Sequence, residues 1–205
     1  MSKKSALVLI EYQREWLHPE GKLRFLLNDP AGFEQSVARS KVALQAARDA
    51  RMLIAHVGLH FSADHRELGG LGAAQFGLRA AIPRAGTFRS NEGGDVHPEP
   101  FTARGPHEIE IRGRTGASAF TGSNLNDFLR NNGVEHIYIM GYALHVCVLA
   151  TLVDGHERGF DVSVLEDCTS AFNPEQRQFT LKDVVHHFGE HIGNEEFVRR
   201  LRDVS

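Results

Sequence analysis

Three kinds of side chain in this sequence could carry out chemistry together: a carboxylate, a cationic group and a thiol. Glu11 directly follows an apolar run typical of a buried strand, and either Arg112 or Arg114 follows another predicted strand. Cys147 lies where a third apolar run ends and the apolar spacing of a helix begins. The dipole at the start of a helix favours a thiolate, which is a nucleophile. The alternative interpretation is that Cys147 is a small core residue, as free cysteines often are.

These side chains need a scaffold that brings the ends of several strands together. Strand-like and helix-like patterns alternate along the chain, which predicts an α/β fold with a mainly parallel sheet of about five or six strands. We expect strands at residues 6–10, 52–57, 107–112, 137–140 and 161–165, helices at 33–47, 124–131, 148–153 and 174–188, and a last strand or helix at 195–201. The carboxyl ends of parallel strands share one edge, where ligands bind. Glu11, Cys147 and one of the two arginines should therefore meet in one pocket.

The composition is that of an ordinary globular protein, with 205 residues, 41% hydrophobic residues and a formal net charge of -3. We expect residues 1–205 to form a single domain. No basic tract favours nucleic-acid binding, and the apolar run near the N-terminus is too short for a signal peptide or a membrane span. Cys147 and Cys168 do not suggest a disulfide framework, and we expect Cys168 to be a packing residue. A cytoplasmic location is the expectation.

Residues 58–105 show no regular period and are rich in glycine, which predicts a long binding loop or lid. The histidines in and beside this segment, His56, His60, His65 and His97, raise the question of a metal site. Zinc sites need three or four convergent ligands, and neither a cysteine nor a paired-histidine helix motif accompanies these residues. We therefore expect no metal and no cofactor, and the sequence leaves open whether the histidine-rich loop binds a metal.

Four segments resemble a known family in the same order along the chain. The first is ALVLIEYQ, where a strand ends in an acid; the second is GRTGASAFTGSNLNDFL, where a basic residue precedes a Ser-Ala-Phe turn and a helix. The third is GYALHVCVLAT, which carries the cysteine, and the fourth is DVSVLEDCTSAF, a strand ending in acid. Together they resemble the isochorismatase-like cysteine hydrolases, which include nicotinamidases and N-carbamoylsarcosine amidohydrolase. The resemblance implies a three-layer α/β/α sandwich.

The resemblance also implies hydrolysis of a C–N bond in a small amide, ureide or carbamate through a thioester-type intermediate. Cys147 would be the nucleophile, Glu11 the general base and Arg114 the basic partner, since its spacing to the Ser-Ala-Phe turn fits better than that of Arg112. The backbone N–H groups of Ala143 and Cys147 would form the oxyanion hole, with a cis peptide bond at 142–143. Substrate contacts are expected from Gln13, Trp16, His60, Phe120 and His145. Relatives are commonly oligomeric, so we expect a homo-oligomer, either a dimer or a tetramer.

The sequence departs from the family pattern at three places. Glu11 stands where the family usually has aspartate, the arginine where it has lysine, and Leu144-His145 where it often has Thr-Asn. Two alternatives follow. One is an isochorismatase that hydrolyses a vinyl ether with the acid alone, although such members lack the cysteine. The other is a catalytically weak binding or assembly protein on the same scaffold.

Overall fold

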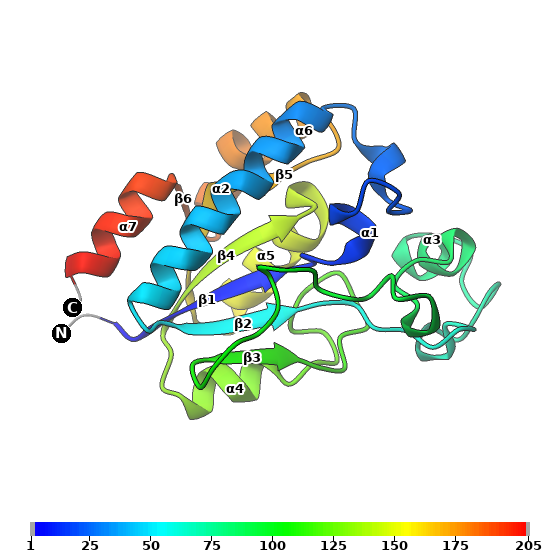
Figure 1. The fold of residues 1–205 in the computed structure, drawn as a ribbon, viewed down its shortest axis with the longest axis horizontal. Helices are drawn as coiled ribbons and strands as arrows, with labels where there is room; N and C mark the ends of the chain where they lie inside the picture. Colours follow the sequence, from blue (N-terminus) through cyan, green and yellow to red (C-terminus); the bar gives the residue numbers. More distant parts are fainter. Residues whose placement is uncertain (1–2, 204–205) are drawn as a thin grey trace.

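The computed structural model describes residues 3–203 and contains a six-stranded parallel sheet in the order β3-β2-β1-β4-β5-β6 (Figure 1). Its strands are β1 (Ser5–Ile10), β2 (Leu53–Val57), β3 (Glu108–Ile111), β4 (His136–Tyr142), β5 (Asp161–Ser170) and β6 (Glu190–Ile192). Its α-helices are α1 (Arg14–Leu17), α2 (Pro30–Asp49), α3 (Leu78–Ala85), α4 (Leu125–Asn131), α5 (Leu149–Glu157), α6 (Pro174–Phe179) and α7 (Asn194–Asp203). The predicted α/β fold with a parallel sheet is confirmed.

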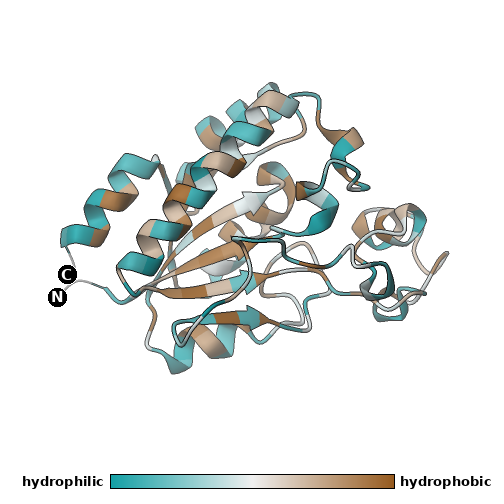
Figure 2. Cartoon of the chain, in the orientation of Figure 1, coloured by the Kyte–Doolittle hydropathy of each residue, from teal (hydrophilic) through white to brown (hydrophobic). Residues whose placement is uncertain are grey.

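The central strands are apolar because helices cover both faces of the sheet. In β1, the residues from Ala6 to Ile10 are at most 1% exposed. A parallel strand buried on both sides needs such a continuous apolar run rather than an alternating one. Figure 2 shows the result, with the strands mostly hydrophobic and the outer surfaces of the helices mostly hydrophilic.

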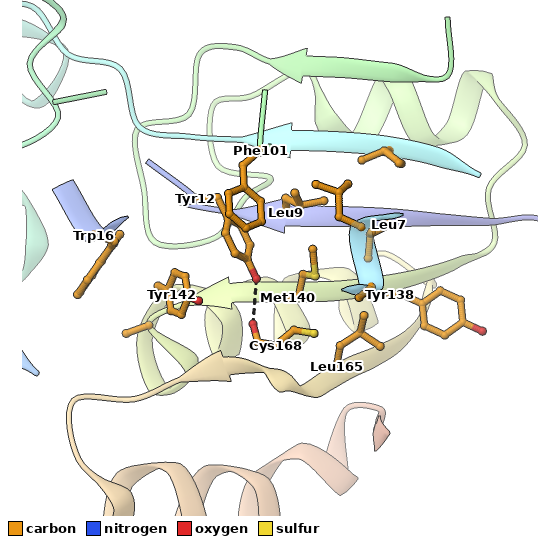
Figure 3. Close-up of a cluster of buried hydrophobic side chains, with 14 of the residues drawn as sticks. Leu7, Leu9, Tyr12, Trp16, Phe101, Tyr138, Met140, Tyr142, Leu165 and Cys168 are labelled. Carbon is orange, nitrogen blue, oxygen red and sulfur yellow. Dashed lines mark hydrogen bonds between the residues drawn. The ribbon is translucent and has the colours of Figure 1, made fainter. Parts of the chain in front are cut away.

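Two separate apolar clusters hold the helical layers against the sheet. On one face, α2 and α7 contribute side chains such as Phe33, Leu44 and Phe197, which pack with the strands and with Tyr12 and other aromatic residues. Figure 3 shows part of this cluster packed on the strands, where the Tyr12 hydroxyl donates to the Cys168 carbonyl at 2.9 Å. On the other face, α4, α5 and the segment after α6 form the second cluster. The three-layer arrangement follows from these two cores.

The strand order places a switch point between β1 and β4. From β1 the chain builds the sheet outward through β2 and β3, and from β4 it builds in the opposite direction through β5 and β6. The loops that follow the two central strands therefore leave in opposite directions and open a crevice between them, the usual ligand site of such sheets. Glu11 follows β1, and the turn containing Cys147 follows β4.

Two predicted segments differ from the structure. Residues 58–105 are not without regular structure: they contain short 3₁₀ turns and α3, which lies beyond the carboxyl ends of the strands (Figure 1). The helix was hidden because it is short, follows a glycine and contains Pro83. The predicted helix at 174–188 is broken after α6 into a π-helical turn, Thr180–Val184, and a 3₁₀ turn, Val185–His187.

The chain end and β5 also depart from expectation. The segment at 195–201 belongs to α7, and a short strand, β6, precedes it. Strand β5 continues beyond Leu165 to Ser170, with a register shift against β4 between Ile139 and Gly141. Between residues 3 and 203, no helix is both long and apolar enough to cross a membrane.

Candidate active site

Glu11 is held in an unusual backbone conformation at the end of β1. Its φ is 59°, in the left-handed region that residues other than glycine rarely adopt, and its N–H donates to the Val57 carbonyl at 2.9 Å. Such outliers persist where the surrounding structure fixes them and they are common at functional sites. The Glu11 side chain is buried, and its two carboxylate oxygens accept hydrogen bonds from different donors. Oε1 accepts from Arg114 Nη2 at 2.7 Å, and Oε2 accepts from Trp16 Nε1 at 3.0 Å.

Arg114, not Arg112, reaches this carboxylate. The loop after β3 folds back, and Arg114 is buried with its Nε donating to the Gly116 carbonyl at 3.0 Å and its Nη2 to the Ala117 carbonyl at 2.6 Å. Arg112 is exposed and pairs with Glu110. Burial lowers the pKa of Arg114, but its interactions with Glu11 and Cys147 together outweigh burial and the net shift is upward, so the guanidinium stays cationic. Within residues 3–203, Arg114 Nη1 is buried without a hydrogen-bond partner.

Cys147 lies in a tight turn between β4 and α5. The peptide bond between Tyr142 and Ala143 is cis, as expected, and a π-helical turn over Leu144–Val148 leads into α5. Thr151, one helical turn later, donates its hydroxyl to the Cys147 carbonyl at 2.7 Å and accepts the Ala119 N–H at 2.9 Å. Thr151 therefore ties the cysteine turn to the loop that carries Arg114. Its position in the sequence, four residues after Cys147, is the signal that places it one helical turn further on.

The thiol, the carboxylate and the guanidinium form one electrostatic unit. Burial raises the pKa of Cys147 strongly, the charge of Glu11 raises it further, and Arg114 lowers it. Burial, which leaves Cys147 only 6% exposed, and the neighbouring acid therefore oppose the thiolate that the helix dipole would favour. A protonated thiol beside a carboxylate can give up its proton to that carboxylate. The three side chains thus converge as predicted.

Two of the residues expected to contact substrate make hydrogen bonds within the protein. The Trp16 indole donates to Glu11 and lies near the rings of Tyr142 and Phe172 at the carboxyl edge of the sheet (Figure 3). Gln13 is fully buried, and its amide donates to the Leu59 carbonyl at 2.8 Å and to the backbone carbonyl of Asp95 at 2.6 Å. Both N–H groups of Gln13 are therefore used to hold the long loop.

The other three expected contacts lie in different surroundings. Phe120 is buried and stacked on Phe160 with centroids 5.9 Å apart, in the apolar cluster that also contains Cys147. His145 is half-buried with its ring edge against Phe172, and burial lowers the pKa of its imidazole.

His60 is the third, and it belongs to a separate cluster. His60, His97 and Glu110 each offer one ligand atom, and these atoms lie within 4.8 Å of one another, so they could hold a metal ion. Sequence reasoning had considered the two histidines and missed Glu110. Cys168, as expected, is a buried free thiol that is not bonded to Cys147.

The sequence and the fold are similar to those of known proteins. Residues 5–196 match the family model of the isochorismatase domain. The chain is 30% identical over 177 residues to a ureidoacrylate amidohydrolase from Variovorax paradoxus, covering 80% of this chain and 68% of that protein. A cysteine hydrolase from Pseudomonas syringae pv. phaseolicola has a similar fold, with a TM-score of 0.80, 21% identity and coverage of 98% of this chain and 94% of that chain.

A second solved structure is also similar. The N-carbamoylsarcosine amidase from Thermoplasma acidophilum has a TM-score of 0.67 and 18% identity, and the match covers 94% of this chain and 97% of that chain. Because the family model spans nearly the whole described chain, the assignment is direct. The chain belongs to the isochorismatase family.

Proposed function

We propose that this protein is a cysteine-dependent amidohydrolase that cleaves a C–N bond in a small amide, ureide or carbamate. The observation that carries the proposal is the buried unit of Glu11, Arg114 and Cys147, in which the acid acts on the thiol and the arginine holds the acid at 2.7 Å. Relatives named ureidoacrylate amidohydrolase support ureides as the first substrate class to test.

The first half of the reaction forms a thioester-type intermediate. Glu11 accepts the proton of the Cys147 thiol as the sulfur attacks the carbonyl carbon. The oxyanion that develops is stabilised by the backbone N–H groups of Ala143 and Cys147, at the turn after β4. Glu11, now protonated, gives the proton to the leaving nitrogen, the C–N bond breaks and an amine or ammonia departs.

The second half regenerates the enzyme. Glu11 removes a proton from water, the resulting hydroxide attacks the thioester carbon, and the C–S bond breaks. The thiolate recovers the proton from Glu11, and a carboxylic acid leaves, or carbamic acid if the substrate is a ureide. Arg114 remains protonated throughout, so it stabilises the carboxylate and the thiolate by charge rather than by proton transfer.

The experiment is an ammonia-release and product-mass screen of amides, ureides and carbamates with purified protein. Cys147→Ala and Cys147→Ser should abolish turnover, and Glu11→Gln should lower kcat by roughly 10²–10⁴-fold, the usual effect of losing a general base. Cys168→Ala is the matched control, because Cys168 is also buried and free but lies outside the site, and it should keep full activity. Full activity of the Cys147 variants would disprove the cysteine mechanism.

The same screen separates the rival functions. Isochorismate hydrolysis that survives Cys147→Ala would identify a vinyl ether hydrolase that uses Glu11. Ligand binding without turnover of any compound would identify a binding protein on this scaffold.

We also infer that the protein is a homo-oligomer. Phe25 and Phe179 are large aromatic residues that are 76% and 61% exposed, and a second copy of the chain could cover them. Light scattering at micromolar concentration should give a multiple of 22.8 kDa, and a mass near 22.8 kDa would contradict the inference.

A further inference from the structure

A cluster of two histidines and a glutamate lies at the same edge of the sheet as Glu11 and outside the catalytic unit. His60 follows β2, His97 lies in the long loop before β3, and Glu110 is in β3. Glu110 Oε1 is 3.4 Å from His60 Nε2 and 4.0 Å from His97 Nδ1. Two imidazole nitrogens and a carboxylate oxygen are a common ligand set for Zn²⁺.

The hydrogen bonds around His60 direct one ring nitrogen into this cluster. His60 Nδ1 is 3.0 Å from Asp95 Oδ2, which also accepts the Ser90 hydroxyl at 2.7 Å. With Nδ1 facing the Asp95 carboxylate, Nε2 is the ring nitrogen that faces the cluster. A carboxylate that orients a histidine in this way is the usual outer support of a metal-binding histidine.

The ligand atoms have no better partners among residues 3–203. His60 Nε2 is buried and makes no hydrogen bond, although Glu110 Oε1 is only 3.4 Å away. His97 is 8% exposed, and the one carboxylate within 4.0 Å of its ring is that of Glu110. A divalent cation placed between this ring nitrogen and the carboxylate oxygen would give both atoms a partner.

We propose that His60 Nε2, His97 Nδ1 and Glu110 Oε1 bind one divalent transition-metal ion of the Zn²⁺ class. Ligands about 2.1 Å from a tetrahedral zinc ion are about 3.4 Å from one another, so the pair formed by His60 and Glu110 already has that separation. His97 needs a small shift. At least one coordination position stays open to water.

The ion would fasten the long loop to the sheet and so support the catalytic unit. The loop segment beside His97 is joined to α1, because Arg14 N–H donates to the Val96 carbonyl at 2.8 Å. Helix α1 also carries Trp16, whose indole holds Glu11. A bound metal would therefore order the loop, α1 and the base together.

The test measures zinc directly and does not depend on a substrate. Protein stripped with EDTA is incubated with ZnCl₂, separated from free metal by gel filtration, and analysed by elemental mass spectrometry. We expect one zinc per chain, falling below about 0.2 in His97→Ala and Glu110→Gln, because two remaining ligands hold zinc poorly. His191→Ala is the matched control: it removes a histidine from a surface pair with Glu166 at 2.6 Å and should not change the zinc content.

A second variant covers the case in which a ligand substitution prevents folding. Asp95→Asn keeps all three ligands but weakens the orientation of His60, and its zinc affinity in a chelator competition should fall about 10–100-fold. Circular dichroism checks the fold of every variant. Zinc content below about 0.2 per chain in the unmodified protein, or an unchanged content in His97→Ala and Glu110→Gln, overturns the proposal. If those two variants do not fold, an unchanged affinity in Asp95→Asn overturns it.

Discussion

The pair formed by Glu11 and Arg114 allows a quantitative test of the buried unit through a double-mutant cycle. Both side chains are at most 3% exposed and share a 2.7 Å charge-assisted hydrogen bond. Glu11→Gln leaves a buried cation without its partner, and Arg114→Met leaves a buried anion, so each should lower the free energy of unfolding by about 3–5 kcal/mol. In the double variant neither uncompensated charge remains. Its loss should be about 2–3 kcal/mol smaller than the sum of the single losses.

The assay is equilibrium urea unfolding of the four proteins, followed by circular dichroism. Arg112→Met is the control, because the side chain of Arg112 is 66% exposed and its pair with Glu110 should contribute at most about 1 kcal/mol. Single losses that add to within about 0.5 kcal/mol would show that Glu11 and Arg114 do not interact. The proposed role of Arg114 in holding the base would then be refuted.

Two further predictions concern the same site. Trp16→Phe keeps an aromatic ring but removes the 3.0 Å indole hydrogen bond to Glu11, and it should lower the free energy of unfolding by about 1.5–3 kcal/mol in the same urea assay. Burial and then the charge of Glu11 raise the pKa of Cys147, so iodoacetamide labelling of Cys147 should increase about tenfold per pH unit from pH 7 to 9, as the thiolate fraction grows. Glu11→Gln removes a negative charge, lowers that pKa and should speed labelling at pH 8; slower labelling would contradict the sign. Cys168, whose pKa burial raises to about 12, serves as the internal control in the peptide map.

The positions of Glu11 and Cys147 could be predicted from sequence because they depend on strand ends. An apolar run long enough to be a central strand fixes where its carboxyl end lies, and parallel strands place all such ends at one edge. The structure adds the reason for their proximity: β1 and β4 are neighbours at the switch point of the sheet. Strand order depends on contacts between distant segments, which hydrophobic periodicity does not record.

The sequence could not decide what the side chains near the site contact. Trp16 was expected to meet substrate, and its indole instead donates to Glu11. This bond depends on the left-handed backbone at Glu11 and on the direction in which α1 leaves the strand, and neither has a signature in a single sequence. The pKa of Cys147 shows a related limit. Its position in the sequence suggests a helix dipole, whereas its burial, which raises the pKa, is revealed only by the packed structure.

The possible metal ligands illustrate a different limit of prediction from sequence. His60 and His97 were visible as candidates, but the third ligand, Glu110, lies in a strand where its charge looked like ordinary alternation. In the sheet, β3 pairs with β2 in a register that sets Glu110 opposite His56, and His60 lies four residues further along. A carboxylate contributed by a neighbouring strand leaves no spacing pattern in the sequence.

The resting charges of the catalytic unit explain how a buried cysteine can react at all. With Glu11 anionic, Arg114 cationic and Cys147 protonated, the unit carries no net charge, and transfer of the thiol proton to Glu11 leaves that total unchanged. The transfer therefore adds no net charge to the buried site, the change that would cost most in a low-dielectric environment. Only the location of the negative charge changes. It moves from the Glu11 carboxylate, which accepts two hydrogen bonds, to the Cys147 sulfur. Arg114 Nη1, which is buried and has no acceptor among residues 3–203, is the donor left to offset that move.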